Sequence, residues 1–346
     1  MSELVIKTLG QDKTEQQKWD AFVDQCQLGT FFHLSGWKTV IEKSYGHTCH
    51  FLYANQDERI VGVLPLAHQK SILFGNALIS LPFCVYGGAA SDDPDVMNAL
   101  EDAAIELAQK LGVDYLEMRY PFGRQNRLSE RCAHSTFGCD LGDDDAAILA
   151  GVKKNERAVI RHSLNNGLEY TVSGDVKECY EIYSESVRNL GTPVFPKHYF
   201  STLKDVFGER CEVLTVTKEG KSVSSVLSFY YKNEVLPYYG GGTPQARELK
   251  SNDFMYYQLM CHARNDRACH RYDFGRSKND SGAFKYKKNW GMAPVPLHYQ
   301  FYLVKAEALP NLSPNNPKYQ LFIQMWKRLP IWLSRLMGPF LSKYLG

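Results

Sequence analysis

One order of elements occurs twice along the chain, and this repetition constrains the possible fold more than any other feature of the sequence. A hairpin, a third strand, a glycine group, a helix and a closing strand are expected at 50–120 and again at 211–274. Gly87 and Gly240 lie 153 residues apart, the closing strands lie 157 apart, and the hairpins begin 161 apart. A nearly constant offset between matching elements indicates an internal duplication.

The duplication predicts a fold of the α+β class (mixed α/β), in which each half forms a mixed β-sheet flanked by helices. A length of 346 residues fits two domains of roughly 150 residues each. We place the first domain at 1–140, the second at 141–305, and a separate tail at 306–346.

A basic helix is predicted at 145–166, where it links the two halves. Lys153, Arg157 and Arg161 recur every four residues, so they share one face of this helix. Such a face either binds RNA or an acidic precursor, or is simply solvated. Lys153 and Arg157 are therefore candidate binding residues.

The tail opens with a linker rich in Pro and Asn and continues as a basic amphipathic segment at 319–345. No acidic residue follows Glu307, whereas Lys and Arg recur to the end. The segment is expected either to lie on an anionic membrane surface or to pack its apolar side onto the second domain.

Cysteine and histidine usage argues against a disulfide framework and against a metal site. The nine Cys are irregularly spaced without a C-x-x-C motif, and no H-x-x-x-H motif accompanies the ten His. No signal peptide and no apolar run of about 18 residues can be read. We expect a cytoplasmic protein, placed peripherally at the inner face of the cytoplasmic membrane if the tail binds lipid. A net charge of +2 does not indicate a general nucleic-acid binder.

The most specific motif lies at 271–291. An expected strand ends in Tyr-Asp-Phe-Gly at 272–275, Arg276-Ser277-Lys278 follows, and a Phe-Lys segment closes in Trp290-Gly291. This motif resembles the C-terminal motif of the FemAB-like family. The basic helix and the segment around Trp37 are also similar to that family, so the resemblance covers about residues 15–305. It looks closest to FemAB-related proteins that accompany exosortase/PEP-CTERM exopolysaccharide systems.

The resemblance implies two GNAT-like domains in tandem. Its characterised members transfer an amino acid from aminoacyl-tRNA to an amine of a peptidoglycan precursor, without a metal. No tightly bound cofactor is expected, and an envelope or polysaccharide precursor would be the partner. This chain lacks the coiled-coil arm of some members, so the donor is left as either aminoacyl-tRNA or acyl-CoA.

Acyl transfer to an amine needs a base, a positioned donor carbonyl and stabilisation of an oxyanion. Asp273 is the candidate general base, although an Asp at a strand end also commonly caps a turn. Lys278 is the second candidate catalytic residue. Cations and a hydroxyl for binding a phosphate-bearing donor follow in the same motif, at Arg276, Ser277, Lys285 and Lys288.

A second group of candidates comes from the glycines of the second repeat. Gly241, with Ser251 and Asn252, is expected in a loop that leads into a helix N-terminus, where backbone N–H groups bind anions. Tyr239 would line the same cleft, or belong to the core. Trp37 is the candidate of the first domain, with a core position as its alternative.

Three functions remain open from the sequence. The first is acyl or aminoacyl transfer to an amine of a cell-envelope or exopolysaccharide precursor. The second is acyl-CoA-dependent N-acyl transfer, although the CoA-binding loop of typical GNAT acetyltransferases cannot be recognised after Gly242. The third is precursor binding without catalysis in a polysaccharide assembly system.

Overall fold

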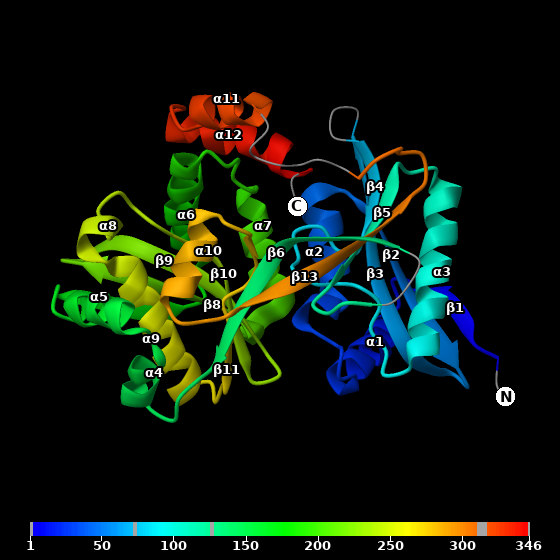
Figure 1. The fold of residues 1–346 in the computed structure, drawn as a ribbon, viewed down its shortest axis with the longest axis horizontal. Helices are drawn as coiled ribbons and strands as arrows, with labels where there is room; N and C mark the ends of the chain where they lie inside the picture. The colour runs from blue at the N-terminus through cyan, green and yellow to red at the C-terminus, as the bar shows by residue number, and fades with distance from the viewer. Residues whose placement is uncertain (1–2, 72–74, 125–127, 310–316, 345–346) are drawn as a thin grey trace. The chain divides into compact units, whose positions relative to one another are not determined.

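A computed structural model describes residues 3–71, 75–124, 128–309 and 317–344 (Figure 1). The chain forms two compact units. The first comprises Met1–Ala133, Pro296–Asn311 and Tyr344–Gly346, and the second comprises His134–Val295 and Leu312–Lys343. The division therefore lies between 133 and 134 rather than at the expected 140, and residues 296–305 belong to the first unit instead of the second.

The sheet of the first unit has its strands in the order β1-β2-β3-β4-β5-β13. Neighbouring strands are antiparallel except β4 and β5, which are parallel and joined through the crossover helix α3. The elements of this unit are β1 (Val5–Thr8), α1 (Lys13–Gln25), a 3-10 turn (Phe31–His33), α2 (Gly36–Tyr45), β2 (Thr48–Gln56), β3 (Arg59–Ser71), β4 (Gly75–Ile79), α3 (Pro94–Leu111), β5 (Tyr115–Tyr120) and β13 (Pro294–Leu303).

The second unit repeats the same arrangement in the order β7-β8-β9-β10-β11-β6. Its one parallel pair, β10 and β11, is again joined through a crossover helix, α9. The elements are β6 (Ser129–Asp140), α4 (Asp145–Gly151), α5 (Lys154–Leu164), β7 (Leu168–Ser173), α6 (Val176–Leu190), α7 (Lys197–Phe207), a 3-10 turn (Gly208–Arg210), β8 (Cys211–Lys218), β9 (Lys221–Tyr231), β10 (Glu234–Gly242), α8 (Ala246–Leu249), α9 (Ser251–Asn265), β11 (Arg271–Asp273), β12 (Ser277–Lys278), α10 (Gly282–Asn289), α11 (Pro317–Trp326) and α12 (Ile331–Ser342).

The two units exchange their sixth strands. In sequence β6 follows β5, yet it pairs with β11 in the second unit, where Asp273 lies opposite Gly138. Conversely, β13 follows the elements of the second unit and pairs with β5, with His298 opposite Tyr120. Each sheet is thus completed by a strand from beyond its own repeat.

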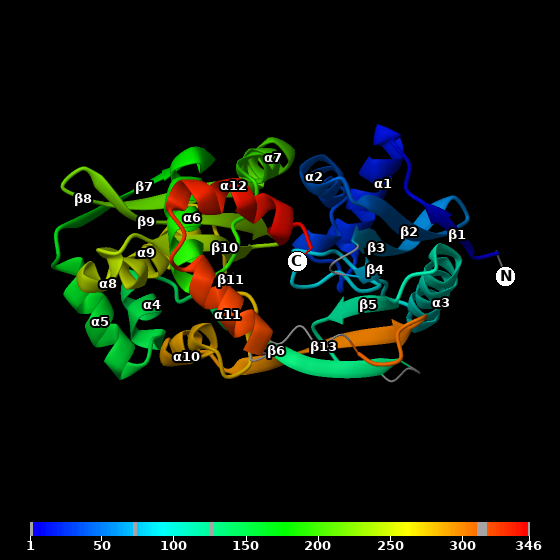
Figure 2. The same ribbon diagram turned by 90° about the horizontal axis from the view of Figure 1, so that it is seen from above.

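Each crossover helix packs its apolar stripe on its sheet. Helix α3 begins at Pro94 after the N-cap Asp93, ends at Gly112 in the left-handed conformation, and buries Leu100 and Ala104 on one face. In the second unit, α9 covers one face of the sheet and α6 and α7 cover the other (Figure 2).

The prediction of a single basic linking helix at 145–166 is wrong. The structure has α4 and α5 instead, with Val152 and Lys153 in extended conformation between them. Arg157 explains the break, because its guanidinium donates to the carbonyl oxygens of Ala150 (2.8 Å) and Val152 (2.9 Å), which the end of α4 leaves without helical partners.

The tail segment expected at 319–345 forms α11 and α12, and α12 packs on α6 in the second unit (Figure 2). Arg335 donates to Ser184 Oγ (2.8 Å) and to the carbonyl oxygen of Glu181 (3.1 Å). Most of the expected Pro- and Asn-rich linker, at 310–316, lies outside the described residues. Among the helices that are described, none is both long and apolar enough to cross a membrane.

Candidate functional site

Asp273 ends β11 in the second unit and is buried. Its carboxylate accepts hydrogen bonds from the backbone N–H of Gly275 (2.8 Å) and from Thr136 Oγ1 on β6 (3.0 Å). The first bond closes a tight turn, and Gly275 has the positive φ that this turn requires (73°). Asp273 therefore occupies the turn-capping position that the sequence offered as its alternative.

Lys287 on α10 binds the backbone of the same turn, and the sequence did not predict this contact. Its ammonium donates to the carbonyl oxygens of Gly275 (2.9 Å) and Arg276 (3.2 Å) and lies 5.2 Å from the ring centre of Phe274. Burial lowers the pKa of Lys287 to about 8, against the opposing effect of the Asp273 carboxylate. The missed signal is helical spacing: Lys287 stands three residues from both Phe284 and Trp290, which places it on their apolar side.

The other cations of the motif lie around this turn at different depths. Lys278 pairs as part of β12 with His134 of β6 and is half-buried, and Arg276 is half-buried in the preceding turn. Ser277 is buried, and its hydroxyl has no hydrogen-bond partner among the described residues. Lys285 and Lys288 are exposed on α10. The motif residues therefore gather at one strand end, as expected, and their catalytic roles stay predictions.

A buried pair of carboxyl groups adjoins the motif through Tyr286, the neighbour of Lys287 on α10. Tyr286 Oη donates to Asp253 Oδ1 (2.7 Å), and Asp253 is hydrogen-bonded to Glu156 on α5. Burial, together with the Asp253 carboxylate, raises the pKa of Glu156 to about 7. Burial beside Asp253 therefore favours the protonated form of Glu156, which sequence reasoning missed because Glu156 stands among the cations of the expected basic face.

The glycines of the second repeat do not form the expected anion-binding loop. Gly241 lies within β10 opposite Ser225, and a Cβ built on it would meet Ser186 Cβ of α6 at 2.5 Å. The glycines thus allow a helix to approach the strand closely. Tyr239 is buried and shares a hydrogen bond with Tyr199 between their hydroxyls (2.8 Å), so it belongs to the core rather than to a cleft.

Ser251 and Asn252 open helix α9, as the expectation of a helix N-terminus required. Ser251 is fully buried, and neither Ser251 Oγ nor Asn252 Oδ1 has a hydrogen-bond partner among the described residues. Asp253 occupies the third helical position with Glu156 beside it. The chain's own carboxyl groups therefore already lie at the positive end of this helix dipole.

The crossover helix of the first unit also begins among carboxylates. Asp93 accepts from the backbone N–H of Asp95 (2.9 Å), and Asp92 accepts from the backbone N–H of Gln27 (3.0 Å). The N-termini of α3 and α9 are thus alike in offering negative charge where an incoming phosphate would need positive charge.

Lys153 and Arg157 hold neighbouring backbone together. Lys153 Nζ donates to the carbonyl oxygen of Lys288 (2.9 Å), which joins α5 to the end of α10. Arg157 donates to the end of α4, as described above. Lys153 is nevertheless exposed, and with Lys154, Lys285 and Lys288 it forms a basic surface on α5 and α10.

Trp37 of the first unit is fully buried, and its indole N–H donates to the carbonyl oxygen of Phe31 (3.1 Å). It therefore occupies the core position that was its alternative. Nearby, His33 Nε2 is 2.8 Å from the carbonyl oxygen of Gly88. The glycine is required there, because a Cβ on Gly88 would lie 2.2 Å from the ring of Tyr120.

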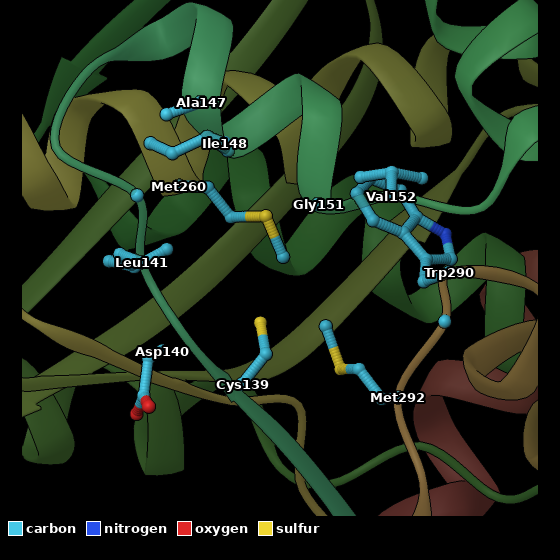
Figure 3. Close-up of a pocket in the computed structure, with 12 residues that line it drawn as sticks. Cys139, Asp140, Leu141, Ala147, Ile148, Gly151, Val152, Met260, Trp290 and Met292 are labelled. Carbon is cyan, nitrogen blue, oxygen red and sulfur yellow. The ribbon is translucent and has the colours of Figure 1, made fainter.

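Two further features are separate from these residues. Glu130, Cys132 and His298 of the first unit place possible ligand atoms within 4.8 Å of one another, a grouping that no sequence motif showed. His298 Nδ1 lies 2.9 Å from Glu130 Oε1, so a hydrogen bond between the two side chains accounts for the contact. The second unit has a small cavity of about 120 Å³, into which the sulfur-bearing side chains of Cys139, Met260 and Met292 point (Figure 3).

Comparison with known proteins supports the fold. Residues 118–288 match the family model described as an acetyltransferase (GNAT) domain, which is slightly less than half of the chain. No curated protein sequence matches this chain. Among solved structures, FemX is similar with 17% identity and a TM-score of 0.65, over 92% of this chain and 100% of FemX.

Two other solved structures are similar over comparable lengths. A tandem GNAT protein from the clavulanic acid biosynthesis pathway has 12% identity and a TM-score of 0.57, over 88% of this chain and 100% of its own. L-PGS from Bacillus licheniformis has 12% identity and a TM-score of 0.54, over 96% of this chain and 99% of its own. The predicted mixed α/β fold of two tandem GNAT-like domains is confirmed.

Proposed function

We propose that this chain transfers an acyl group, and specifically an aminoacyl group, to an amine of a cell-envelope or exopolysaccharide precursor. The amine nitrogen forms a bond to the donor's carbonyl carbon, the carbonyl carbon's bond to the donor oxygen breaks, and the amine proton passes to a base. The tRNA 3′ oxygen takes up this proton from the base and leaves as a hydroxyl. The similarity in fold to FemX supports this class of reaction, and the residue motif at 271–291 supports the FemAB-like family.

The observation that carries the proposal is the buried turn at 273–276. Asp273 accepts from the Gly275 N–H and Lys287 donates to the carbonyl oxygens of Gly275 and Arg276, and Arg276 and Lys278 belong to or directly follow this turn. A rigid turn with cations at its rim suits a reaction in which the donor carbonyl must be positioned and its developing negative charge stabilised. Asp273 is the proposed base, and Lys278 the proposed stabiliser of the oxyanion.

The donor is proposed to be aminoacyl-tRNA rather than acyl-CoA. A CoA pyrophosphate gains most where a helix N-terminus is free of negative charge, and both α3 and α9 begin beside carboxyl groups of the chain. The exposed lysines on α5 and α10 instead offer a surface for an RNA backbone. Phosphate contacts spread over such a surface do not require a single pyrophosphate pocket.

The test measures binding and transfer with a charged tRNA pool, uncharged tRNA and acyl-CoA in parallel, at low and moderate salt. Charged tRNA is expected to bind more tightly than uncharged tRNA at both salt concentrations. Uncharged tRNA reports the non-specific electrostatic attraction, which weakens steeply with salt. Preference for acyl-CoA would refute the proposed donor and leave an acyl-CoA N-acyltransferase.

Lys278→Ala tests the site. Transfer to a precursor amine, followed as a mass increase of the acceptor, is expected to fall at least 100-fold, because one oxyanion partner is typically worth that much. Lys221→Ala, at the exposed lysine that begins β9, is the matched control and should keep full activity. Unchanged transfer by Lys278→Ala would remove Lys278 from the site.

A further inference from the structure

In α12 small side chains are buried and large apolar side chains are exposed, which is the reverse of an ordinary surface helix. The buried residues of α12 are small: Ser334, Gly338 and Ser342 recur at intervals of four. A Cβ built on Gly338 would lie 2.8 Å from the carbonyl oxygen of Val194, so only a small residue fits there. The inner face of α12 therefore contributes close backbone packing rather than large apolar side chains.

The large apolar side chains point outward instead. Trp332, Leu336 and Phe340 follow one another at intervals of four and are 66%, 60% and 74% exposed. Leu321 and Met325 on α11 add a second pair at the same spacing, each 62% exposed. Scattered exposed apolar residues are common, but a contiguous face built of them marks an interaction surface.

The charge around this face identifies its partner. Residues 308–346 contain five Lys or Arg and no Asp or Glu. Lys327 and Arg328, between the two helices, are exposed beside the apolar face. Trp, Phe and Leu on one face with cations at its border is the composition of helices that lie in the interface of anionic membranes. A second copy of the chain would instead bring equal positive charges against each other.

We propose that α11 and α12 form a docking surface for an anionic lipid bilayer, with Trp332, Leu336 and Phe340 inserted among the lipid headgroups and Lys327 and Arg328 above them. This surface is independent of the proposed transfer reaction, and it holds the second unit at a membrane without a spanning helix. Arg335 holds α12 on α6 through Ser184 and Glu181, so docking needs no unfolding of the tail.

The test is sedimentation of the full chain with vesicles of phosphatidylcholine alone, or with about one third phosphatidylglycerol. We expect binding to the anionic vesicles that falls at least tenfold in Trp332→Ser/Phe340→Ser. Lys327→Glu/Arg328→Glu should lose the preference for anionic lipid. Leu164→Ser/Val295→Ser, at exposed apolar residues outside the tail, is the matched control and should bind as the wild type does.

Near-ultraviolet circular dichroism of each variant establishes that the fold is intact. Failure of the wild type to sediment with anionic vesicles overturns the proposal, and so does undiminished binding by Trp332→Ser/Phe340→Ser. Light scattering tests the alternative that a second copy of the chain covers this face. A wild-type dimer that becomes monomeric in the same double variant, without vesicle binding by either protein, would assign the face to a second copy of the chain.

Discussion

At the scale of single residues, the candidate site depends on charges that the fold has removed from water. Lys287 is the main example, since its ammonium replaces hydration with two carbonyl oxygens and aromatic rings. Such a group costs folding free energy while it is charged, because burial favours the neutral amine. This cost arises at the turn that carries Asp273, and perturbed pKa values of this kind cluster at functional sites.

The pKa of Lys287 predicts a pH dependence of stability. The folded state has a pKa of about 8 and the unfolded state one near 10.5, so between these values the unfolded state binds more protons. The free-energy cost of burying the charged ammonium is complete below about pH 8 and disappears as the pH rises toward 10.5. From pH 7 to pH 10, the stability of the wild type should rise by about 2–3 kcal/mol relative to Lys287→Met.

Urea unfolding of both proteins across that range measures this difference. Lys288→Met, at the exposed neighbouring lysine, is the control, and its stability relative to the wild type should not change with pH. A constant difference between the wild type and Lys287→Met would show that the ammonium is hydrated rather than buried.

Sequence alone predicted where the motif of the site lies in the chain, but not which charged side chains are buried there. Asp273, Arg276 and Lys278 could be predicted because a strand end followed by glycine brings consecutive side chains to one place. Lys287 and Glu156 could not, because each is a charged residue whose burial is decided by tertiary packing. Gly241 was misplaced for a related reason: consecutive glycines are equally typical of an anion-binding loop and of a strand that a helix approaches closely.

At the scale of elements, the crossover helices lie where the sequence predicts them, whereas the predicted linking helix is divided where tertiary hydrogen bonds decide the helix ends. Repeated strands and both crossover helices could be predicted from periodicity and caps. The break between α4 and α5 could not, since it depends on where the Arg157 guanidinium donates. The exchange of β6 and β13 also could not be predicted. The alternation of side chains along a strand shows which residues share a face, but not which strand is its partner.

The packing of α12 predicts a local effect of one substitution. In Gly338→Val the new side chain would meet the backbone of Val194, so α12 should leave α6 while the two sheets stay folded. Trypsin cleavage at the exposed Lys327 and Arg328 should become at least tenfold faster. Gly151→Ala, at a helical glycine with open space around its built Cβ, is the control, and cleavage as slow as in the wild type for Gly338→Val would contradict the packing.

At the scale of the whole molecule, the exchanged strands make each unit depend on chain from the other repeat. Leu64 is fully buried in β3 of the first unit. Leu64→Ala should cost about 2–5 kcal/mol, and because β13 completes the first sheet but follows the second repeat in the chain, the loss should reach the second unit. Hydrogen exchange of the β8–β10 amides should accelerate together with that of β2 and β3. Unchanged protection of β8–β10 would mean that the units unfold independently.

The same strand exchange sets an order of events on the ribosome. The partner of β5 in the first sheet is β13, which is translated about 180 residues later. At about 5–20 residues per second, the nascent first unit keeps an open strand edge for roughly 10–40 s. During that time β5 is available to any extended peptide nearby, so slow codons or a ribosome stall after β5 should favour aggregation or chaperone capture. The first sheet is therefore completed only after β13 has been translated.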